Sequence, residues 1–390
     1  MMELSKKMNR LGTESAFKVL AQAQALEAKG MDVVHLEIGE PDFATQKNIC
    51  EAATKAMANG FTHYCNSQGL LQLRQEIARE VKRTRDVTVD PDRIVVTPGA
   101  KPIMFYTILA LLEEGDEAIY PDPGFPIYES MINFTGAKAV PIPLREELDF
   151  RLDVDELKSI ITPRTKLIII NSPHNPTGGV LEEDDLMAIA NLAVKNDITV
   201  LSDEVYEHII YEGKYASMLR VPDMMDRTIL LNGFSKTYAM TGWRLGYAVM
   251  PKGLVDAVVR LIVNSVSCTP PFTQFAGIEA LAGPQDSIGV MVEEFRKRRN
   301  LIVEGLNMIP GISCVLPKGA FYAFPNIKKL GMDSARIADY LLNNAGVATL
   351  SGTSFGKYGE GYLRLSYATS QENLKKALTK IGDAVARLNG

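Results

Sequence analysis

A short apolar run at residues 166–170 constrains the fold of this chain more than any other feature. Its sequence, Lys-Leu-Ile-Ile-Ile, lacks the alternation of apolar and polar residues expected of a strand with one solvated face. It therefore indicates a parallel strand that is covered on both sides. Further short strands are predicted at residues 93–97, 117–120, 198–203, 228–231 and 245–250, and helical patterns alternate with them, which is typical of an α/β fold.

The second half of the chain changes character after Gly283-Pro284, where the pattern breaks. A long helix is predicted at residues 288–307, followed by a smaller α+β unit. Its predicted elements are strands at 313–316, 321–324 and 362–366 and helices at 334–344 and 372–388. Earlier helices are predicted at 16–29, 47–59, 102–112, 182–195, 253–263 and 273–281. We expect an N-terminal segment (1–44) packed with the small domain, a large domain (45–283) and a small C-terminal domain (284–390).

Composition excludes several classes of protein. With 390 residues, of which 46% are hydrophobic, the chain can bury a large core in two or three folding units. The net charge of -5 and the lack of a lysine-arginine run provide no basic field for nucleic acid. No apolar stretch reaches the length of a membrane span, and the N-terminus lacks the apolar core of a signal peptide, so we expect a cytoplasmic protein. The cysteines and histidines show no ligand spacing, and no metal is predicted.

Lys236 is the candidate reactive residue. It follows the strand predicted at 228–231 and lies in a segment of small and hydroxyl residues bounded by Gly233 and Gly242. A lysine held in a pocket can lose its proton and attack a carbonyl, and pyridoxal phosphate uses such an amine as its anchor. Arg244 offers a planar fork that fits a phosphate. The residues alone also allow a loop lysine and a structural arginine.

A candidate anion site follows the strand at 93–97. Gly99, Ala100 and Lys101 form a tight connection to a helix that has Pro102 in its first turn. Free backbone N–H groups and the positive end of the helix dipole point at a ligand in such a connection. The spacing is neither a Walker nor a dinucleotide fingerprint.

Polar residues follow two of the predicted strands at the edge where open α/β sheets bind ligands. Asn175 comes after the strand at 166–170, and Asp203 ends the strand at 198–203. A buried carboxylate needs a cationic partner, and a protonated pyridine nitrogen is one, although a helix N-cap is the alternative for Asp203. Tyr206, three residues on, is a candidate hydrogen-bond donor.

Four further residues are candidates with ordinary alternatives. Arg364 lies in a strand pattern with apolar neighbours and could bind a carboxylate in bidentate fashion or form a structural salt bridge. Phe125 could stack on a flat cofactor or pack in the core. Tyr64 could donate a hydrogen bond to a phosphate or pack, and Gly39 lies in a turn or simple loop.

Several motifs taken together resemble one family. Ser235-Lys236-Thr237 with Thr241-Gly242-Trp243-Arg244-Leu245-Gly246 is similar to the Schiff-base signature of class I and II aminotransferases, the fold type I pyridoxal-phosphate enzymes. Asn175-Pro176-Thr177-Gly178, Gly39-Glu40-Pro41-Asp42 and the stretch from Tyr64 to Arg74 follow the family's order, so the resemblance covers nearly the whole chain. It implies a large domain with a mostly parallel seven-stranded sheet flanked by helices, plus a smaller α+β domain.

The resemblance also implies roles for the candidates. Lys236, Asp203 and Tyr206 would be catalytic, with Asp203 on the pyridine nitrogen and Tyr206 and Asn175 on the phenolic oxygen. Phe125 would stack on the ring, and Tyr64 would cross to the cofactor of the other subunit of a homodimer with shared sites. The phosphate ligands would be Gly99, Ala100, Lys101, Ser235 and Arg244. The substrate would contact Gly39, Asn175, Arg364 and Lys101.

The implied activity is transfer of an amino group between an L-amino acid and a 2-oxo acid with ping-pong kinetics. Lys101 and the stretch 37–42 are similar to the aspartate-type branch, which favours aspartate with 2-oxoglutarate. Alanine or aromatic donors remain alternatives, as do a carbon–sulfur β-lyase, an aminocyclopropane-carboxylate synthase, and a nucleotide-binding protein without the cofactor. Gly233 departs from the family, since many members have serine there, and one phosphate hydroxyl is then missing.

Overall fold

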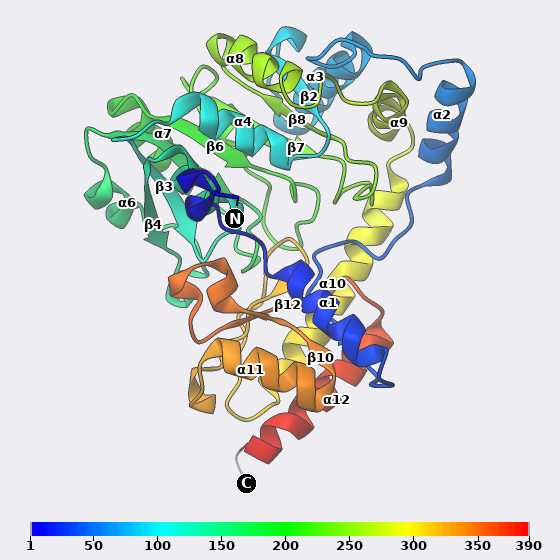
Figure 1. Ribbon diagram of the computed structural model, residues 1–390, viewed down its shortest axis with the longest axis vertical. Helices are drawn as coiled ribbons and strands as arrows, with labels where there is room; N and C mark the ends of the chain where they lie inside the picture. The colour runs from blue at the N-terminus through cyan, green and yellow to red at the C-terminus, as the bar shows by residue number, and fades with distance from the viewer. Residues whose placement is uncertain (1, 389–390) are drawn as a thin grey trace.

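The computed structural model describes residues 2–388 and is built around one seven-stranded sheet (Figure 1). The strand order is β2-β8-β7-β6-β5-β3-β4. Strand β8 is antiparallel to both of its neighbours, and the remaining pairs are parallel. The strands are β2 (Ile94–Thr97), β3 (Glu117–Asp122), β4 (Lys138–Pro143), β5 (Thr165–Asn171), β6 (Thr199–Asp203), β7 (Thr228–Gly233) and β8 (Gly246–Val249). The predicted fold class is confirmed.

Strand β5 has helices on both faces, as its apolar sequence predicts. Leu167 and Ile169 pack in one hydrophobic cluster with the helix at residues 101–111, whereas Ile168 and Ile170 pack in another with the helix at 183–195. Successive side chains of a strand point to opposite faces, so an apolar run is required when both faces are covered.

Eight α-helices surround this sheet. They are α2 (Lys47–Ala58), α3 (Leu71–Arg85), α4 (Lys101–Leu111), α5 (Ile127–Thr135), α6 (Val154–Ile160), α7 (Glu183–Lys195), α8 (Lys252–Val263) and α9 (Pro271–Ala282). Helix α3 is not predicted from the sequence because ten of its fifteen residues are charged or polar. Its buried Leu73, Ile77 and Val81 recur every four residues, and this spacing is the signal that identifies the helix.

The C-terminal elements form a second unit, drawn in yellow to red in Figure 1. It contains the antiparallel sheet β11-β12-β9 and the long helix α10 packed on α12. Its elements are α10 (Asp286–Asn307), β9 (Tyr322–Ala323), α11 (Ser334–Tyr340), β10 (Val347–Ala348), β11 (Leu350–Ser351), β12 (Leu363–Ser366) and α12 (Gln371–Leu388). The domain limits predicted at 44/45 and 283/284 stay predictions.

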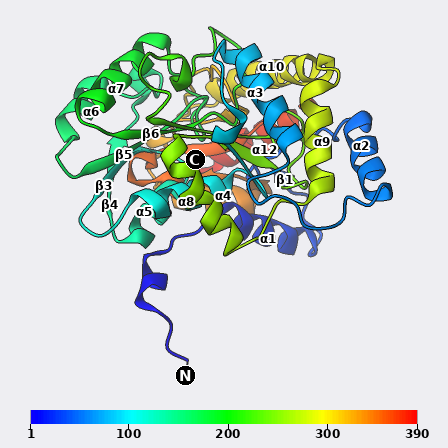
Figure 2. The ribbon, with the colours of Figure 1, turned by 90° about the horizontal axis from the view of Figure 1, so that it is seen from above.

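The N-terminal segment packs on this second unit. Strand β1 (Val34–His35) pairs in parallel with β10, and Ala23 of helix α1 (Ala16–Glu27) is buried with Leu342 and Ala348. Residues before α1 include the 3-10 turn η1 (Lys6–Arg10) beside α5, and this stretch projects from the body in Figure 2.

The prediction of a strand at 313–316 is wrong, because the structure has no strand over these residues. Only Ser313 pairs, through an isolated bridge to Asn326. The side chain of Asn307 hydrogen-bonds both the N–H and the carbonyl of Cys314 at 2.8 and 3.1 Å, so this backbone has partners without a ladder.

Two of the cysteines, Cys65 and Cys268, lie close together in the structure although they are far apart in the sequence. Burial and the Cys268 thiol raise the pKa of Cys65 to about 11.

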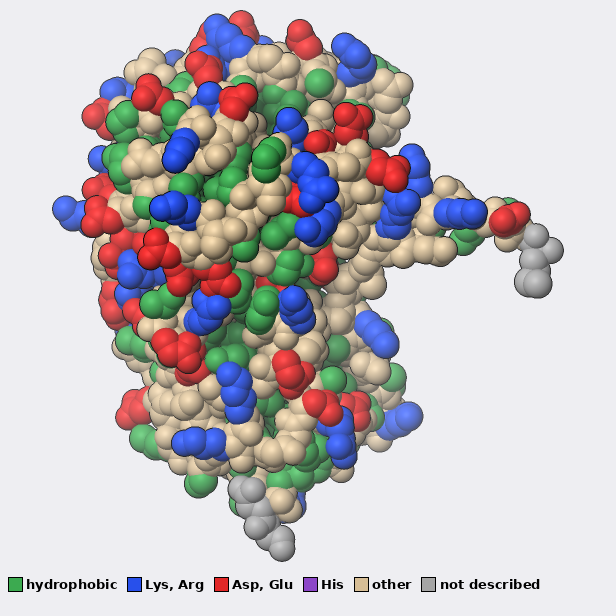
Figure 3. Space-filling view, turned by 90° about the vertical axis from the view of Figure 1, so that its left-hand side faces the viewer, with side chains coloured by type: hydrophobic (Ala, Val, Ile, Leu, Met, Phe, Trp, Pro, Cys, Tyr) green, Lys and Arg blue, Asp and Glu red, His purple; other side chains and the backbone are tan. Residues whose placement is uncertain are grey.

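The molecular surface carries no single-sign patch on the face shown in Figure 3, where acidic and basic side chains alternate. Among residues 2–388, no helix combines the length and the low charge needed to cross a membrane.

Candidate active site

A cavity of about 560 Å³ lies at the carboxyl ends of β5, β6 and β7 and extends to the strands of the second unit. The register aligns Asn171 with Asp203 and Asp203 with Leu231, so the polar residues after these strands converge. Among the residues that line the cavity are the predicted Gly39, Ala100, Lys101, Phe125, Asn175, Asp203, Tyr206, Ser235, Lys236, Arg244 and Arg364. A cavity of this size can enclose a cofactor together with a small substrate.

Lys236 reaches the cavity three residues beyond the end of β7. Its Nζ donates a hydrogen bond of 2.5 Å to the carbonyl of Gly39 and lies 5.9 Å from the centre of the Tyr206 ring. Burial lowers the pKa of Lys236 to about 8. About one tenth of the amine is therefore neutral near pH 7, far more than for an ordinary lysine, and the neutral form is the one that attacks a carbonyl.

Asp203 is buried at the end of β6 and is held by a tyrosine that the sequence did not identify. Tyr128 donates a hydrogen bond of 2.7 Å to Oδ2 of Asp203. Burial raises the pKa of Asp203 to about 6, and the bond from Tyr128 opposes this rise. No helix begins at Asp203, so the N-cap alternative is wrong. Phe125 lies against Tyr128 edge to face, with ring centres 5.8 Å apart.

Asn175 presents an unpaired polar atom to the cavity. Its backbone N–H donates to Oδ1 of Asn171 at 2.9 Å, and the Asn171 amide in turn donates to the carbonyl of Asp203 at 2.9 Å. Oδ1 of Asn175 is buried without a hydrogen-bond partner among the described residues. Because a buried polar atom without a partner is costly, this amide fits a site for a polar ligand.

The Gly99-Ala100 turn and Arg244 form one cradle. Gly99 has φ of +93°, and a Cβ there would lie 2.2 Å from Nη2 of Arg244. A Cβ on Gly246 would lie 2.5 Å from the backbone of Gly99 and Ala100, so the turn rests directly on β8. The first turn of α4 leaves backbone N–H groups without partners in the helix, and with the guanidinium they fit a phosphate.

Gly233, for which the resemblance leads us to expect serine, lies against this cradle. A Cβ at Gly233 would meet the Leu245 carbonyl at 3.3 Å and the Ala100 side chain at 3.5 Å. A larger side chain would therefore need the neighbouring backbone to move by a few tenths of an ångström.

Arg364 is buried on β12 and makes no salt bridge among the described residues, so the alternative of a structural ion pair is wrong. Its Nη2 donates to the carbonyl of Glu37, and its Nε is buried without a partner. The guanidinium carbon lies 4.7 Å from the centre of the Tyr322 ring and 5.0 Å from that of Phe355. Such a cation retains hydrogen-bonding capacity for an anionic ligand.

Tyr322 is a further residue that the sequence missed. Its hydroxyl shares a hydrogen bond of 2.7 Å with that of Tyr206, and a Cβ on Gly39 would lie 2.2 Å from the Tyr322 hydroxyl. Tyr322 thus links Tyr206, Gly39 and Arg364. The sequence gives little sign of this role, because a tyrosine in a short apolar strand is expected to pack in the hydrophobic core.

Two predicted residues do not line the cavity. Gly99 is outside the lining but lies against Arg244, which lines the cavity. Tyr64 is 88% exposed and is not among the residues that line the cavity of its own chain. Its predicted contact with a partner's site stays a prediction.

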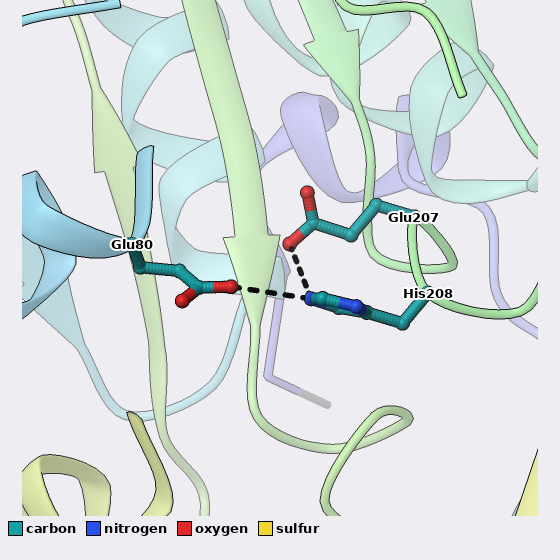
Figure 4. Close-up of side chains that lie close together, drawn as sticks. All are labelled: Glu80, Glu207 and His208. Carbon is teal, nitrogen blue, oxygen red and sulfur yellow. Dashed lines mark ion pairs between the residues drawn. The ribbon is translucent and has the colours of Figure 1, made fainter. Parts of the chain in front are cut away.

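A charged cluster of Glu80, Glu207 and His208 lies outside the cavity lining (Figure 4). Nε2 of His208 lies 3.3 Å from Oε1 of Glu80 and 3.5 Å from Oε1 of Glu207. Three such groups within 4.8 Å could ligate a metal, but Arg83 and Arg85 already form ion pairs with the same two carboxylates. A protonated His208 balances the cluster better than a divalent ion would.

The fold and this cavity define a class of protein: an enzyme with a buried lysine and a buried aspartate in one cavity at the edge of a mostly parallel sheet. The chain belongs to the family of class I and II aminotransferases, whose model matches residues 31–381. It is therefore a pyridoxal-phosphate-dependent aminotransferase.

Individual relatives agree with this assignment. The chain is 44% identical to an aspartate aminotransferase of Pyrococcus abyssi, over 91% of this chain and 92% of the relative. It is 39% identical to an aromatic-amino-acid aminotransferase of Thermococcus litoralis, over 97% of each. The solved structure of aspartate aminotransferase from Thermus thermophilus with maleate matches at a TM-score of 0.95 and 38% identity, over 98% of this chain and 100% of that one.

Proposed function

We propose that this aminotransferase moves the amino group between L-aspartate and 2-oxoglutarate by a ping-pong mechanism. The observation that carries the proposal is that two cationic side chains, Arg364 and Lys101, line the same cavity as Lys236. Two cations suit two carboxylates, and relatives named aspartate aminotransferase support the choice.

The cofactor would be held by residues of the cavity. Lys236 would be its covalent anchor, Asp203 would pair with the pyridine nitrogen, and Asn175 and Tyr206 would bind the phenolic oxygen. Phe125 would cover the ring. The phosphate would bind at Gly99, Ala100, Lys101, Ser235 and Arg244. Bound pyridoxal phosphate supplies an electron sink for negative charge at the substrate α-carbon.

The chain's own residues would orient the substrate and move the proton. Arg364 would bind the α-carboxylate as a bidentate pair beside the Gly39 backbone. With its pKa near 8, Lys236 can take the proton from the α-carbon and return it nearby, as general base and acid. Asp203, kept ionised by Tyr128 and by the pyridinium, would keep the ring nitrogen charged.

An amino-donor panel against several 2-oxo acids tests the function. We expect the highest kcat/KM with aspartate and 2-oxoglutarate. Release of pyruvate and ammonia without an added oxo acid would instead indicate a lyase of the same fold.

The assignment of Lys236 as the covalent anchor of the cofactor is tested separately. Borohydride reduction of the holoenzyme followed by peptide mapping should place the cofactor on Lys236, and Lys236→Ala should abolish turnover. A tag on another lysine would overturn the assignment.

We also propose a homodimer in which Tyr64 completes the partner's phosphate site. The exposed position of Tyr64 supports this. Hybrid dimers of one Tyr64→Ala chain and one Lys236→Ala chain should contain one intact site and recover activity. Hybrids no more active than the Tyr64→Ala homodimer would contradict the shared site. A cytoplasmic location stays a prediction from the sequence.

A further inference from the structure

Lys101 is already paired in this structure, and its partner is a residue with no assigned role. Glu14 lies just before α1, lines the cavity and forms an ion pair with Lys101. The segment that carries it is tied to α5, where the N–H of Gly12 donates to Oγ of Ser130 at 2.9 Å. The pair therefore joins the N-terminal segment to the start of α4 across the cavity.

The charge of Glu14 acts inside the cavity. Its side chain is 16% exposed, whereas that of Lys101 is 45% exposed. A carboxylate buried to this extent requires a nearby cation. Burial lowers the pKa of Lys236, and Glu40 and Glu14 are the carboxylates that oppose this lowering, so Glu14 acts on the reactive amine as well.

The ion pair between Glu14 and Lys101 cancels the two charges where these side chains line the cavity. Lys101 also lies over Phe125, with its Nζ 5.5 Å from the ring centre, and Phe17 lines the cavity beside Glu14. An uncharged or aromatic substrate side chain therefore meets a neutral ion pair and apolar rings. A substrate with a distal carboxylate meets Lys101 only if Glu14 gives up its place, because two carboxylates on one ammonium repel each other.

We propose that Glu14 is a specificity-determining residue that serves as the internal counter-ion of Lys101. In the free enzyme the Glu14 carboxylate pairs with the Lys101 ammonium. When a dicarboxylic amino acid binds, its distal carboxylate replaces Glu14 as the partner of Lys101. This inference rests on the proposed function, in which Lys101 faces the substrate. The exchange reduces selectivity for dicarboxylates and keeps amino acids with uncharged side chains as substrates.

The test compares L-aspartate with L-asparagine, which has nearly the same shape and lacks the charge. In Glu14→Gln holoenzyme with saturating cofactor, the ratio of kcat/KM for aspartate to that for asparagine should rise at least fivefold. Phenylalanine should become a poorer substrate because Lys101 is then unpaired. Glu14→Asp, which keeps the charge, should stay nearer to wild type. Lys101→Gln should shift the ratio in the opposite direction.

A binding measurement provides a second readout. Glu14→Gln holoenzyme should bind maleate at least fivefold more tightly than wild type, with no gain for 3-phenylpropionate. Glu27→Gln, at the C-terminal end of α1 and outside the cavity lining, is the matched control and should change neither quantity.

The outcomes separate the two proposals. An unchanged aspartate-to-asparagine ratio in Glu14→Gln enzyme that still transaminates overturns the role of Glu14 and leaves the proposed function intact. A fall in the ratio in both Glu14→Gln and Lys101→Gln means that Glu14 only positions Lys101, and this also overturns the inference. Absence of transamination with every donor overturns the proposed function itself.

Discussion

The Tyr128 hydroxyl donates a hydrogen bond of 2.7 Å to Oδ2 of Asp203, across 75 residues of sequence. This bond stabilises the ionised form of a carboxylate whose pKa burial raises to about 6. Asp203, the proposed partner of the pyridine nitrogen, is thus kept charged partly by a residue on α5.

Tyr128→Phe should move the acid limb of the pH profile to higher pH. Without the hydroxyl, the pKa of Asp203 rises further, so the carboxylate is protonated at a pH where the wild type is still active. We expect a shift of roughly half a unit to one unit in the acid limb of kcat/KM, measured between pH 5 and 8. Tyr106→Phe, which removes a hydroxyl bonded to Ser265 instead, is the control. Identical profiles for Tyr128→Phe and wild type would refute the role.

Gly99→Ala should weaken cofactor binding. The added Cβ would lie 2.2 Å from Nη2 of Arg244, displacing the guanidinium from the phosphate cradle. We expect the Kd for pyridoxal phosphate to increase about tenfold or more, equivalent to ~1.4 kcal/mol, by absorbance titration of the apoenzyme. Gly115→Ala is a matched control, because Gly115 has φ of +100° against +93° at Gly99 and has nothing within 4 Å. Equal losses in both variants would assign the effect to backbone strain alone.

His208→Gln should alter the pH dependence of stability. Burial lowers the pKa of His208, but Glu207 and Glu80 raise it more, with Arg85 opposing them, so the net pKa is above 6.5. The folded state therefore holds a proton more tightly than the unfolded state. The extra stability is complete below about pH 6.5 and is lost as pH rises through the folded pKa.

Urea unfolding of the holoenzyme from pH 6 to 9 measures this effect. The free energy of unfolding of His208→Gln should fall below that of wild type by about 1–2 kcal/mol at pH 6, with a smaller difference at pH 9. His63→Gln removes an exposed histidine and should show no such trend. A difference that stays constant with pH would mean that folding leaves the pKa of His208 unchanged, which would contradict the prediction.

Arg364→Lys should weaken both substrates while leaving the fold intact. Lysine cannot form the bidentate pair or stack between Tyr322 and Phe355 as the planar guanidinium does. We expect kcat/KM to fall about 100-fold for both the amino acid and the oxo acid, mainly through KM. Steady-state kinetics with each substrate varied in turn measures this. Unchanged KM values would assign Arg364 to structure.

Local patterns in the sequence predict much of the fold and of the site. The unbroken apolar run of β5 requires cover on both faces, and Asn175, Asp203 and Lys236 follow strands whose carboxyl ends meet at one edge. These residues are identifiable because their position depends on the nearest strand. For Arg364 and Arg244 the residues alone leave structural alternatives open, and the resemblance to the aminotransferases favours ligand binding for both.

Tertiary structure alone decides which other side chains meet these residues. Tyr206 and Tyr322, whose hydroxyls share a hydrogen bond, are 116 residues apart in the sequence, and Glu14 reaches Lys101 from the segment before α1. The strand expected at 313–316 failed for the same reason, because the side chain of Asn307 satisfies its backbone. Periodicity and turn chemistry act over a few residues and are visible in the sequence. Contacts between distant segments depend on how the elements pack, and they determine the hydrogen-bond partner of Asp203 and the counter-ion of Lys101.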